Sequence, residues 1–166
     1  MSYVFGENKV QLQGYTNFDL ARDLDKRRST NGYTFMFVGA AINWASQLQH
    51  CIVLSSVEIE YLALSEGARE MIWLQRLLGD LKIHQSEYNL FCDSRSVIFM
   101  AHNHSSQRRS KHIDAHAHFV CHVVEEGKLK VVKIDTKINP ADIFTKVVAK
   151  EKFECARTSL GLVKKR

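Results

Sequence analysis

One stretch of about six helical turns constrains the fold more than any other part of the chain. Between Val57 and Leu78, residues of a single stripe recur every three or four positions, which predicts an amphipathic helix that ends near Gly79. The stripe consists of Val57, Tyr61, Leu64, Ala68, Ile72, Gln75 and Leu78. The small residues Ala63 and Gly67 would let this helix lie close to a sheet. Ser55 and Glu58 have the spacing of a capping box at its start.

Glu60 lies in the second turn of this helix, beside the face that we expect to be buried. We therefore expect its carboxylate to point inward at the edge of the core. A buried carboxylate needs partners, and a divalent cation is one of the few good ones. The alternative is a solvated surface side chain on a capped helix. The helix alone leaves both interpretations open.

Composition describes an ordinary globular chain with a slight preference for acidic partners. Its 166 residues suit one domain, 1–166, and 45% are hydrophobic while 25% are charged. The net charge of +5 mildly favours partners such as nucleic acid. No apolar run approaches the roughly 18 residues of a membrane span. Four cysteines without a Cys-x-x-Cys motif, and no signal peptide, predict free thiols in an intracellular protein of the cytoplasm or nucleus that is not secreted.

The order of the predicted elements indicates an α/β domain. Three strands come first as a meander, and strands then alternate with helices, which predicts a mixed sheet with helices packed on it. The predicted strands are 10–15, 33–38, 41–44, 89–92 and 129–134. The predicted helices are 56–78, 94–100, 113–126 and 150–160, with a further helical start at Asn139-Pro140-Ala141-Asp142. Asp93 or Ser94 is expected to cap the helix that ends at Met100.

Two further acids fall where such a sheet places its ligands. Asp93 ends a short apolar strand, and the carboxyl ends of strands form the ligand-binding edge of open α/β sheets. Asp142 lies in a first helical turn, where the helix dipole favours a carboxylate. The first strand should offer a fourth acid near position 17, but the chain has Asn17 there and Asp19 two residues later.

Several separate motifs in this order resemble the RNase H domain of copia-type LTR retrotransposon Pol polyproteins. The resemblance runs from about Leu12 to Leu162 and leaves 163–166 as a basic tail. The matching pieces are Gly14-Tyr15-Thr16, Arg27-Arg28-Ser29-Thr30-Asn31-Gly32-Tyr33, Leu54-Ser55-Ser56-x-Glu58-x-Glu60-Tyr61, Cys92-Asp93-Ser94-x-Ser96, Lys111-His112-Ile113-Asp114 with His118-Phe119, and Ala141-Asp142-Ile143-x-Thr145-Lys146.

The resemblance implies a fold and an activity. The fold would be the RNase H fold, a five-stranded mixed sheet with three antiparallel meander strands and then two parallel ones, covered by helices. The activity would be hydrolysis of the RNA strand of RNA–DNA hybrids by four acids that hold two Mg²⁺ (or Mn²⁺) ions. By motif, three of these acids fall on Glu60, Asp93 and Asp142. The reverse transcriptase of such polyproteins has no counterpart in this chain.

Asn17 departs from the family pattern, which has an aspartate at this position. Two cations about 3.5–4 Å apart need carboxylates between them, whereas an amide offers one neutral oxygen and donors that a cation repels. Asp19 faces the same side of a strand but lies roughly 6.5–7 Å further on, so we expect no rescue. Weak or absent hydrolysis follows, and whether two ions, one or none bind stays open. The alternatives are a non-catalytic nucleic-acid-binding domain and a relic without a role.

Histidines and basic residues gather in the second half of the chain. Six of the eight histidines lie between His102 and His122. The pairs His112/His116 and His118/His122 would need a further ligand to bind zinc, and no cysteine is spaced to supply it. The candidate contacts to nucleic-acid phosphates are Arg108, Arg109, Lys111 and His112, with a solvated charge cluster as the alternative. Trp44 and Trp73 are expected to pack in the core or on the sheet rather than stack on bases.

Overall fold

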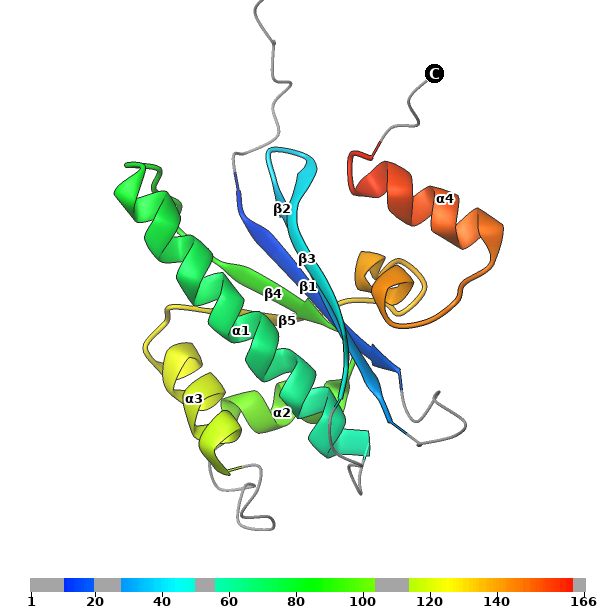
Figure 1. The fold of residues 1–166 in the computed structure, drawn as a ribbon. Helices are drawn as coiled ribbons and strands as arrows, with labels where there is room; N and C mark the ends of the chain where they lie inside the picture. The colour runs from blue at the N-terminus through cyan, green and yellow to red at the C-terminus, as the bar shows by residue number, and fades with distance from the viewer. Residues whose placement is uncertain (1–10, 20–27, 50–55, 104–113, 163–166) are drawn as a thin grey trace, which may run out of the picture.

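The computed structural model describes residues 11–19, 28–49, 56–103 and 114–162, and it confirms the predicted mixed sheet with helices packed on it (Figure 1). The elements in chain order are β1 (Gln13–Asp19), β2 (Thr30–Phe37), β3 (Ala40–Leu48), α1 (Ser56–Asp80), β4 (Asn89–Cys92), α2 (Arg95–His102), α3 (Asp114–Glu125), β5 (Lys130–Lys133), the 3₁₀ helix η2 (Pro140–Phe144) and α4 (Lys150–Ser159).

The five strands lie in the order β3-β2-β1-β4-β5. β1 pairs antiparallel with β2, and β2 pairs antiparallel with β3, as a meander should. β1 and β4 are parallel, and so are β4 and β5. The meander and the parallel pair therefore share β1 as the central strand, and the predicted pattern of directions is confirmed.

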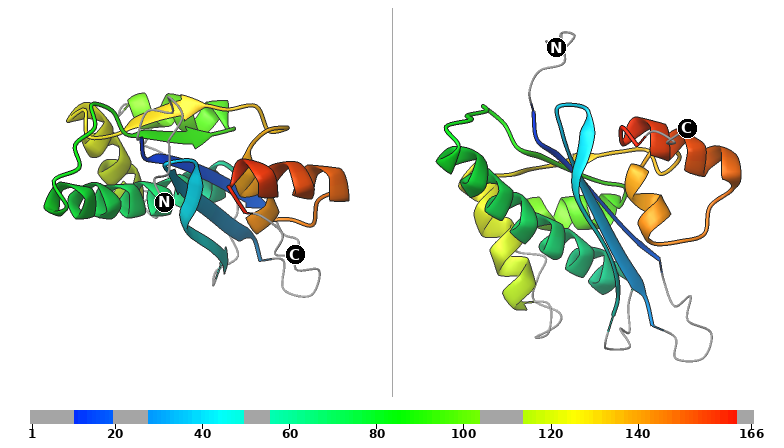
Figure 2. Two further views of the ribbon diagram at one scale, coloured as in Figure 1. Left: turned by 90° about the horizontal axis from the view of Figure 1, so that it is seen from above. Right: turned by 45° about the horizontal axis from the view of Figure 1, so that its top comes forward.

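Figures 1 and 2 show two groups of helices around this sheet. Helix α1 runs along the strands and packs on β1, while α2 and α3 lie beside it. η2 and α4 lie apart from these three helices, and η2 packs on β1 and β2. Within the residues that the structure describes, no helix has both the length and the apolar character that crossing a membrane requires.

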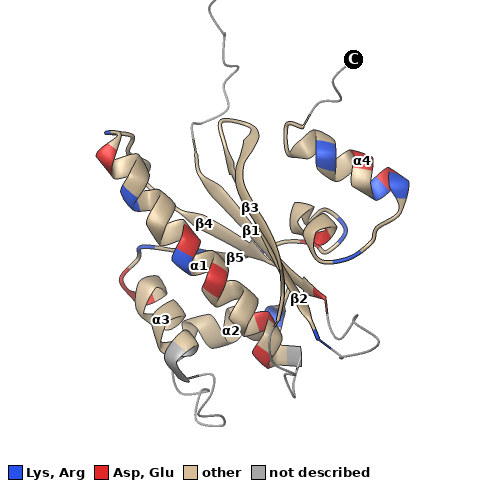
Figure 3. Cartoon of the chain, in the orientation of Figure 1, with Lys and Arg blue, Asp and Glu red and all other residues tan. Residues whose placement is uncertain are grey.

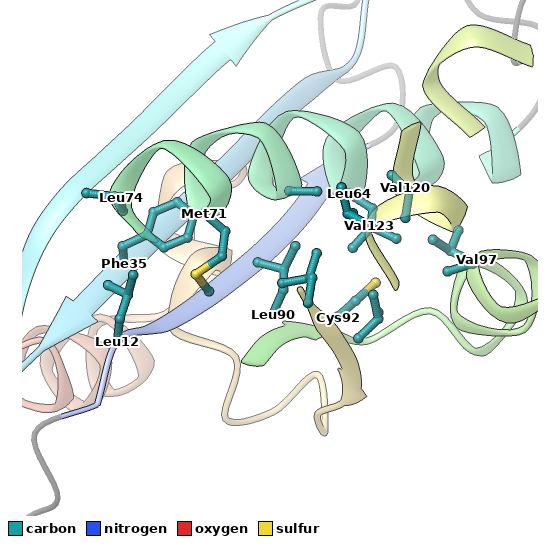
Figure 4. Close-up of a cluster of buried hydrophobic side chains, with 14 of the residues drawn as sticks. Leu12, Phe35, Leu64, Met71, Leu74, Leu90, Cys92, Val97, Val120 and Val123 are labelled. Carbon is teal, nitrogen blue, oxygen red and sulfur yellow. The ribbon is translucent and has the colours of Figure 1, made fainter. Parts of the chain in front are cut away.

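A single hydrophobic core fills the space between α1, the sheet and α3 (Figure 4). Leu64 and Met71 of α1 meet Phe35 of β2 and Leu90 of β4, and Val120 and Val123 of α3 close the far side. All six side chains are buried. Most of this core is drawn from apolar residues that alternate along strands or repeat along helices, so its elements could be read from the sequence.

The predicted stripe of α1 is wrong at two positions in its second half, although Leu78 at its end is buried as predicted. Tyr61, Leu64 and Ala68 are fully buried, as predicted. Further along, Met71 and Leu74 are the buried residues rather than Ile72 and Gln75.

Neither tryptophan is a core residue, so the core alternative of that prediction is wrong, whereas Trp44 does lie on the sheet, in β3. Trp44 is 56% exposed and Trp73 is 54% exposed. Trp44 lies on the outward side of the edge strand β3, where Ile42 and Leu48 are also exposed. Trp73 lies on the side of α1 that faces away from the sheet. The predicted free thiols are confirmed for Cys92, Cys121 and Cys155, whereas Cys51 lies outside the described residues.

β1 and β3 extend further than their sequences predicted. β1 continues beyond the predicted run 10–15 through Asn17 to Asp19, because each residue from Gln13 to Asp19 lies opposite a residue of β2. β3 likewise runs to Leu48 along β2. Pairing with a neighbouring strand has outweighed the low strand propensity of these polar residues.

Gly67 allows α1 to approach the sheet closely, as predicted. A β-carbon at this position would lie 2.4 Å from Cγ2 of Thr16 in β1. We expect Gly67→Ala to lower the free energy of unfolding, because overpacking costs about 1–3 kcal/mol and outweighs the roughly 1 kcal/mol that alanine gains in a helix. Urea unfolding would measure the loss. Gly79→Ala in the same helix is the control, since a β-carbon there meets nothing within 4 Å and should stabilise.

Candidate functional site

Asn17 is fixed between the sheet and η2. It lies within β1 opposite Gly32 of β2 and is 4% exposed. Gly32 has no room for a side chain, since a β-carbon there would lie 2.6 Å from Cγ2 of Thr145 and 3.0 Å from Cβ of Phe144. The glycine thus lets η2 rest directly on the strands, and this contact brings Asp142 over Asn17.

Asp142 is fully buried and hydrogen-bonded to the residue that departs from the family pattern. Asn139 begins η2 as its N-cap, with its Oδ1 accepting from the Ala141 amide at 3.1 Å, and Asp142 follows in the first turn as predicted. The amide Nδ2 of Asn17 donates to Asp142 Oδ1 and also to Thr145 Oγ1 at 3.2 Å. An amide that donates to a carboxylate turns its own oxygen away from it, so Asn17 adds donors, not a ligand oxygen, at this point.

Two lysines complete the surroundings of Asp142. Lys146, one helical turn later, places its Nζ 2.9 Å from Oδ1, and Lys152 of α4 forms an ion pair with Oδ2. Figure 3 shows blue segments on the connection that follows η2 and on α4, and a red segment on η2. Each lysine side chain is 30% exposed whereas Asp142 is 0% exposed. Both oxygens of the buried carboxylate are therefore matched by positive charge.

Glu60 and Asp93 form a second acidic group. Glu60 is half-buried in α1 and accepts a hydrogen bond from the hydroxyl of Ser94, the N-cap of α2. Burial raises the pKa of Glu60, the Ser94 hydrogen bond opposes this shift, and the negative charge of Asp93 adds to it. Asp93 follows β4 directly and accepts from Thr136 Oγ1 at 2.9 Å. The carboxylates of Glu60 and Asp93 thus repel each other at the carboxyl end of β4.

Thr136 and Lys152 connect the two acidic groups. While the hydroxyl of Thr136 donates to Asp93, its carbonyl accepts from Lys152 Nζ at 3.1 Å, and the same Nζ reaches Asp142. Within the described residues, no three histidine, cysteine, aspartate or glutamate side chains lie together as a metal ion would require. As arranged, these residues do not fit the two-cation centre that the resemblance implies, and the role of Glu60, Asp93 and Asp142 as metal ligands stays a prediction.

The predicted contacts to nucleic-acid phosphates are not among the described residues. Arg108, Arg109, Lys111 and His112 lie outside the described residues. Of the site's lysines, Lys146 had a sequence signal in its i,i+4 spacing from Asp142. Lys152 and Thr136 had none, because their contacts depend on how the chain returns between η2 and α4.

His116 of α3 lies against α1 rather than in the acidic site. Its Nδ1 is 3.1 Å from Ser65 Oγ and 3.4 Å from a guanidinium nitrogen of Arg69. Burial lowers the pKa of His116, and the charge of Arg69 lowers it further, while Glu66 acts in the opposite direction. His112, which is four residues before His116, lies outside the described residues, and His118 and His122 are exposed.

This lowered pKa predicts a loss of stability in mild acid. The unfolded chain takes up a proton at His116 more readily than the folded chain, so the stabilising contribution is present above about pH 6.5 and is lost as the pH falls through the folded pKa. We expect His116→Gln to flatten the decline in melting temperature between about pH 7.5 and about pH 5.5. His84→Gln, at an exposed histidine, should leave the decline as in the natural chain.

This chain is similar to known proteins in both its fold and its sequence. No protein-family model matches the chain. Its fold matches that of LC11-RNase H1 in complex with an RNA/DNA hybrid with a TM-score of 0.56, at 18% identity, covering 81% of this chain and 94% of that one. Over 158 residues, it is 47% identical to the retrovirus-related Pol polyprotein from transposon TNT 1-94 of Nicotiana tabacum, a match that covers 95% of this chain. This chain is an RNase H-like domain homologous to copia-type Pol polyproteins.

The RNase H-like domain corresponds to a small part of these polyproteins. The TNT 1-94 match spans 12% of that protein. The Pol polyprotein from transposon RE2 of Arabidopsis thaliana is 32% identical over 158 residues, and the match covers 95% of this chain and 11% of RE2. The predicted resemblance and the predicted RNase H fold are both confirmed.

Proposed function

We propose that this RNase H-like domain binds RNA–DNA hybrids and that its hydrolysis of the RNA strand is severely impaired. The homology to Pol polyproteins and the likeness to an RNase H1 that was crystallised with an RNA/DNA hybrid support the substrate. One observation carries the impairment: the carboxylate of Asp142 accepts from the amide of Asn17 and from the ammonium groups of two lysines.

Electrostatics explains why this arrangement is unfavourable for hydrolysis. A centre of two divalent cations brings four positive charges into a small volume, and only carboxylates placed between them offset that repulsion. Asn17 contributes no charge, and Lys146 and Lys152 already neutralise Asp142. The remaining acidic pair, Glu60 and Asp93, supplies two carboxylates and no more.

Hybrid binding depends on positive charge and not on the carboxylates. Lys133 donates to the main-chain carbonyl of Asp93, Lys146 and Lys152 border Asp142 with 30% of each side chain exposed, and the chain carries a net charge of +5. Ammonium groups at such a rim suit the phosphates of a nucleic-acid backbone, which positions a duplex without reading its sequence. Binding should therefore persist where hydrolysis does not, which is the alternative function of a non-catalytic nucleic-acid-binding domain.

A salt titration with matched duplexes tests this proposal. Fluorescence anisotropy would compare an RNA–DNA hybrid with a DNA duplex of the same sequence, with Mg²⁺ or Mn²⁺ present. We expect hybrid binding that weakens linearly on a plot of log affinity against log salt, with little cleavage product. Absence of binding at low salt would contradict the proposal and favour a relic without a role.

A further inference from the structure

Lys152 occupies a position that joins both acidic groups. Its ammonium group forms the ion pair with the buried Asp142 and donates to the carbonyl of Thr136 at 3.1 Å. Thr136 in turn donates its hydroxyl to Asp93 at 2.9 Å. Lys152 therefore neutralises Asp142 and also orients Thr136, the residue that donates to Asp93.

We infer that Lys152 is an internal counter-ion that holds the acidic groups together in the absence of a divalent cation and competes with such a cation for Asp142. A fully buried carboxylate without a compensating charge is costly, and in this chain the compensation comes from within. The inference goes beyond the proposed function, because it concerns how the folded domain depends on cations and not what it binds.

The contribution of Lys152 differs from that of Lys146. Lys146 reaches Asp142 along the same local segment, four residues away, and pairs with Oδ1, which Asn17 also contacts. Lys152 pairs with Oδ2 and links η2 to the turn at Thr136. Replacing Lys152 therefore leaves Asp142 Oδ2 without this counter-ion and releases the carbonyl of Thr136, and we expect a divalent cation to supply the missing positive charge.

Thermal unfolding with and without Mn²⁺ tests the inference, with no nucleic acid present. We expect Lys152→Met to lower the melting temperature by roughly 4–8 °C in the absence of divalent cation. Saturating Mn²⁺ should restore most of that loss, since a ligand that binds only the folded state stabilises it. The melting temperature of the natural chain should respond much less to the same Mn²⁺.

Two variants make the result decisive. Lys150→Met removes the same charge from an exposed position of the same helix and should behave as the natural chain does. Asp142→Asn combined with Lys152→Met removes both charges, so it should melt close to the natural chain and show no Mn²⁺ response. If the single variant Lys152→Met does not fold, the double variant still tests the inference. The inference predicts that the double variant folds, so a double variant that does not fold would overturn it.

Other outcomes would also overturn it. An equal Mn²⁺ response of the natural chain and Lys152→Met would show that Lys152 does not compete with the cation. Equal melting temperatures for Lys152→Met and Lys150→Met would show that it is not the counter-ion of Asp142. The melting experiment is done without an RNA–DNA hybrid. Its result is therefore independent of whether the domain binds hybrids as proposed above.

Discussion

Asn17→Asp should raise hydrolysis of the RNA strand by at least about two orders of magnitude, which is what one well-placed electrostatic contact contributes to a transition state. The substitution replaces a donor at Asp142 by a second carboxylate without changing the shape of the side chain. The new carboxylate adds negative charge beside Asp142, at the position where the resemblance implies a metal-binding acid. The measurement is the initial rate of cleavage of a labelled RNA–DNA hybrid with Mg²⁺ or Mn²⁺.

Asn43→Asp provides the matched control for this change. Asn43 of β3 also donates its amide to a carboxylate, that of Glu70 in α1, so the same substitution creates the same kind of carboxylate pair away from Asp142. Its cleavage rate should stay at the level of the natural chain. Equal rates for Asn17→Asp and the natural chain would show that the amide is not what limits hydrolysis.

Leu90→Ala should lower the free energy of unfolding by about 3–5 kcal/mol, in the upper part of the range for buried leucines. Leu90 is fully buried in β4, and its Cδ1 would lie 2.7 Å and 3.5 Å from β-carbons placed on Gly14 and Gly67. The leucine thus fills space that two glycines leave open. Because neither glycine has a side chain that can move into the vacated volume, the cavity in the variant should stay large.

Urea unfolding would measure this loss, with the slope of the transition unchanged if the variant keeps its fold. Leu81→Ala is the control, because Leu81 is 60% exposed and its truncation should change stability by no more than about 0.5 kcal/mol. A loss at Leu90 as small as that at Leu81 would contradict the packing described for β4.

The fold could be predicted where local pattern and tertiary packing agree. β4 and the N-cap of η2 were predicted at the observed residues, because a short apolar run and an Asn-Pro start each have few alternatives. The alternating pattern ended at residue 15, and only the expected position of the fourth acid pointed to a strand through Asn17, since the polar residues there become a strand by pairing with β2. The exposure of Trp44 likewise follows from the position of β3 at the sheet edge, which depends on the order of all five strands.

The acidic positions of the candidate site could be predicted from the sequence, but the lysine that neutralises Asp142 from α4 could not. Family motifs indicated Asp93, Asp142 and the unusual Asn17, and the structure places Asn17 against Asp142. The role of Lys152 had no counterpart in the sequence pattern, because it follows from the path of the chain between η2 and α4. Which carboxylate a long, flexible lysine side chain contacts depends on the tertiary structure, and residue spacing in the sequence does not predict it.

The hydrogen bond between Asn17 and Asp142 joins residues that are 125 positions apart. During synthesis, Asn17 therefore leaves the ribosome long before its partner has been translated. The meander and α1 can associate early, but the buried charges can be matched only when the final segment arrives. Translation that stops before α4 would leave Asp142 without Lys152. We expect proteases to degrade such a truncated product, because its buried carboxylate would lack this counter-ion.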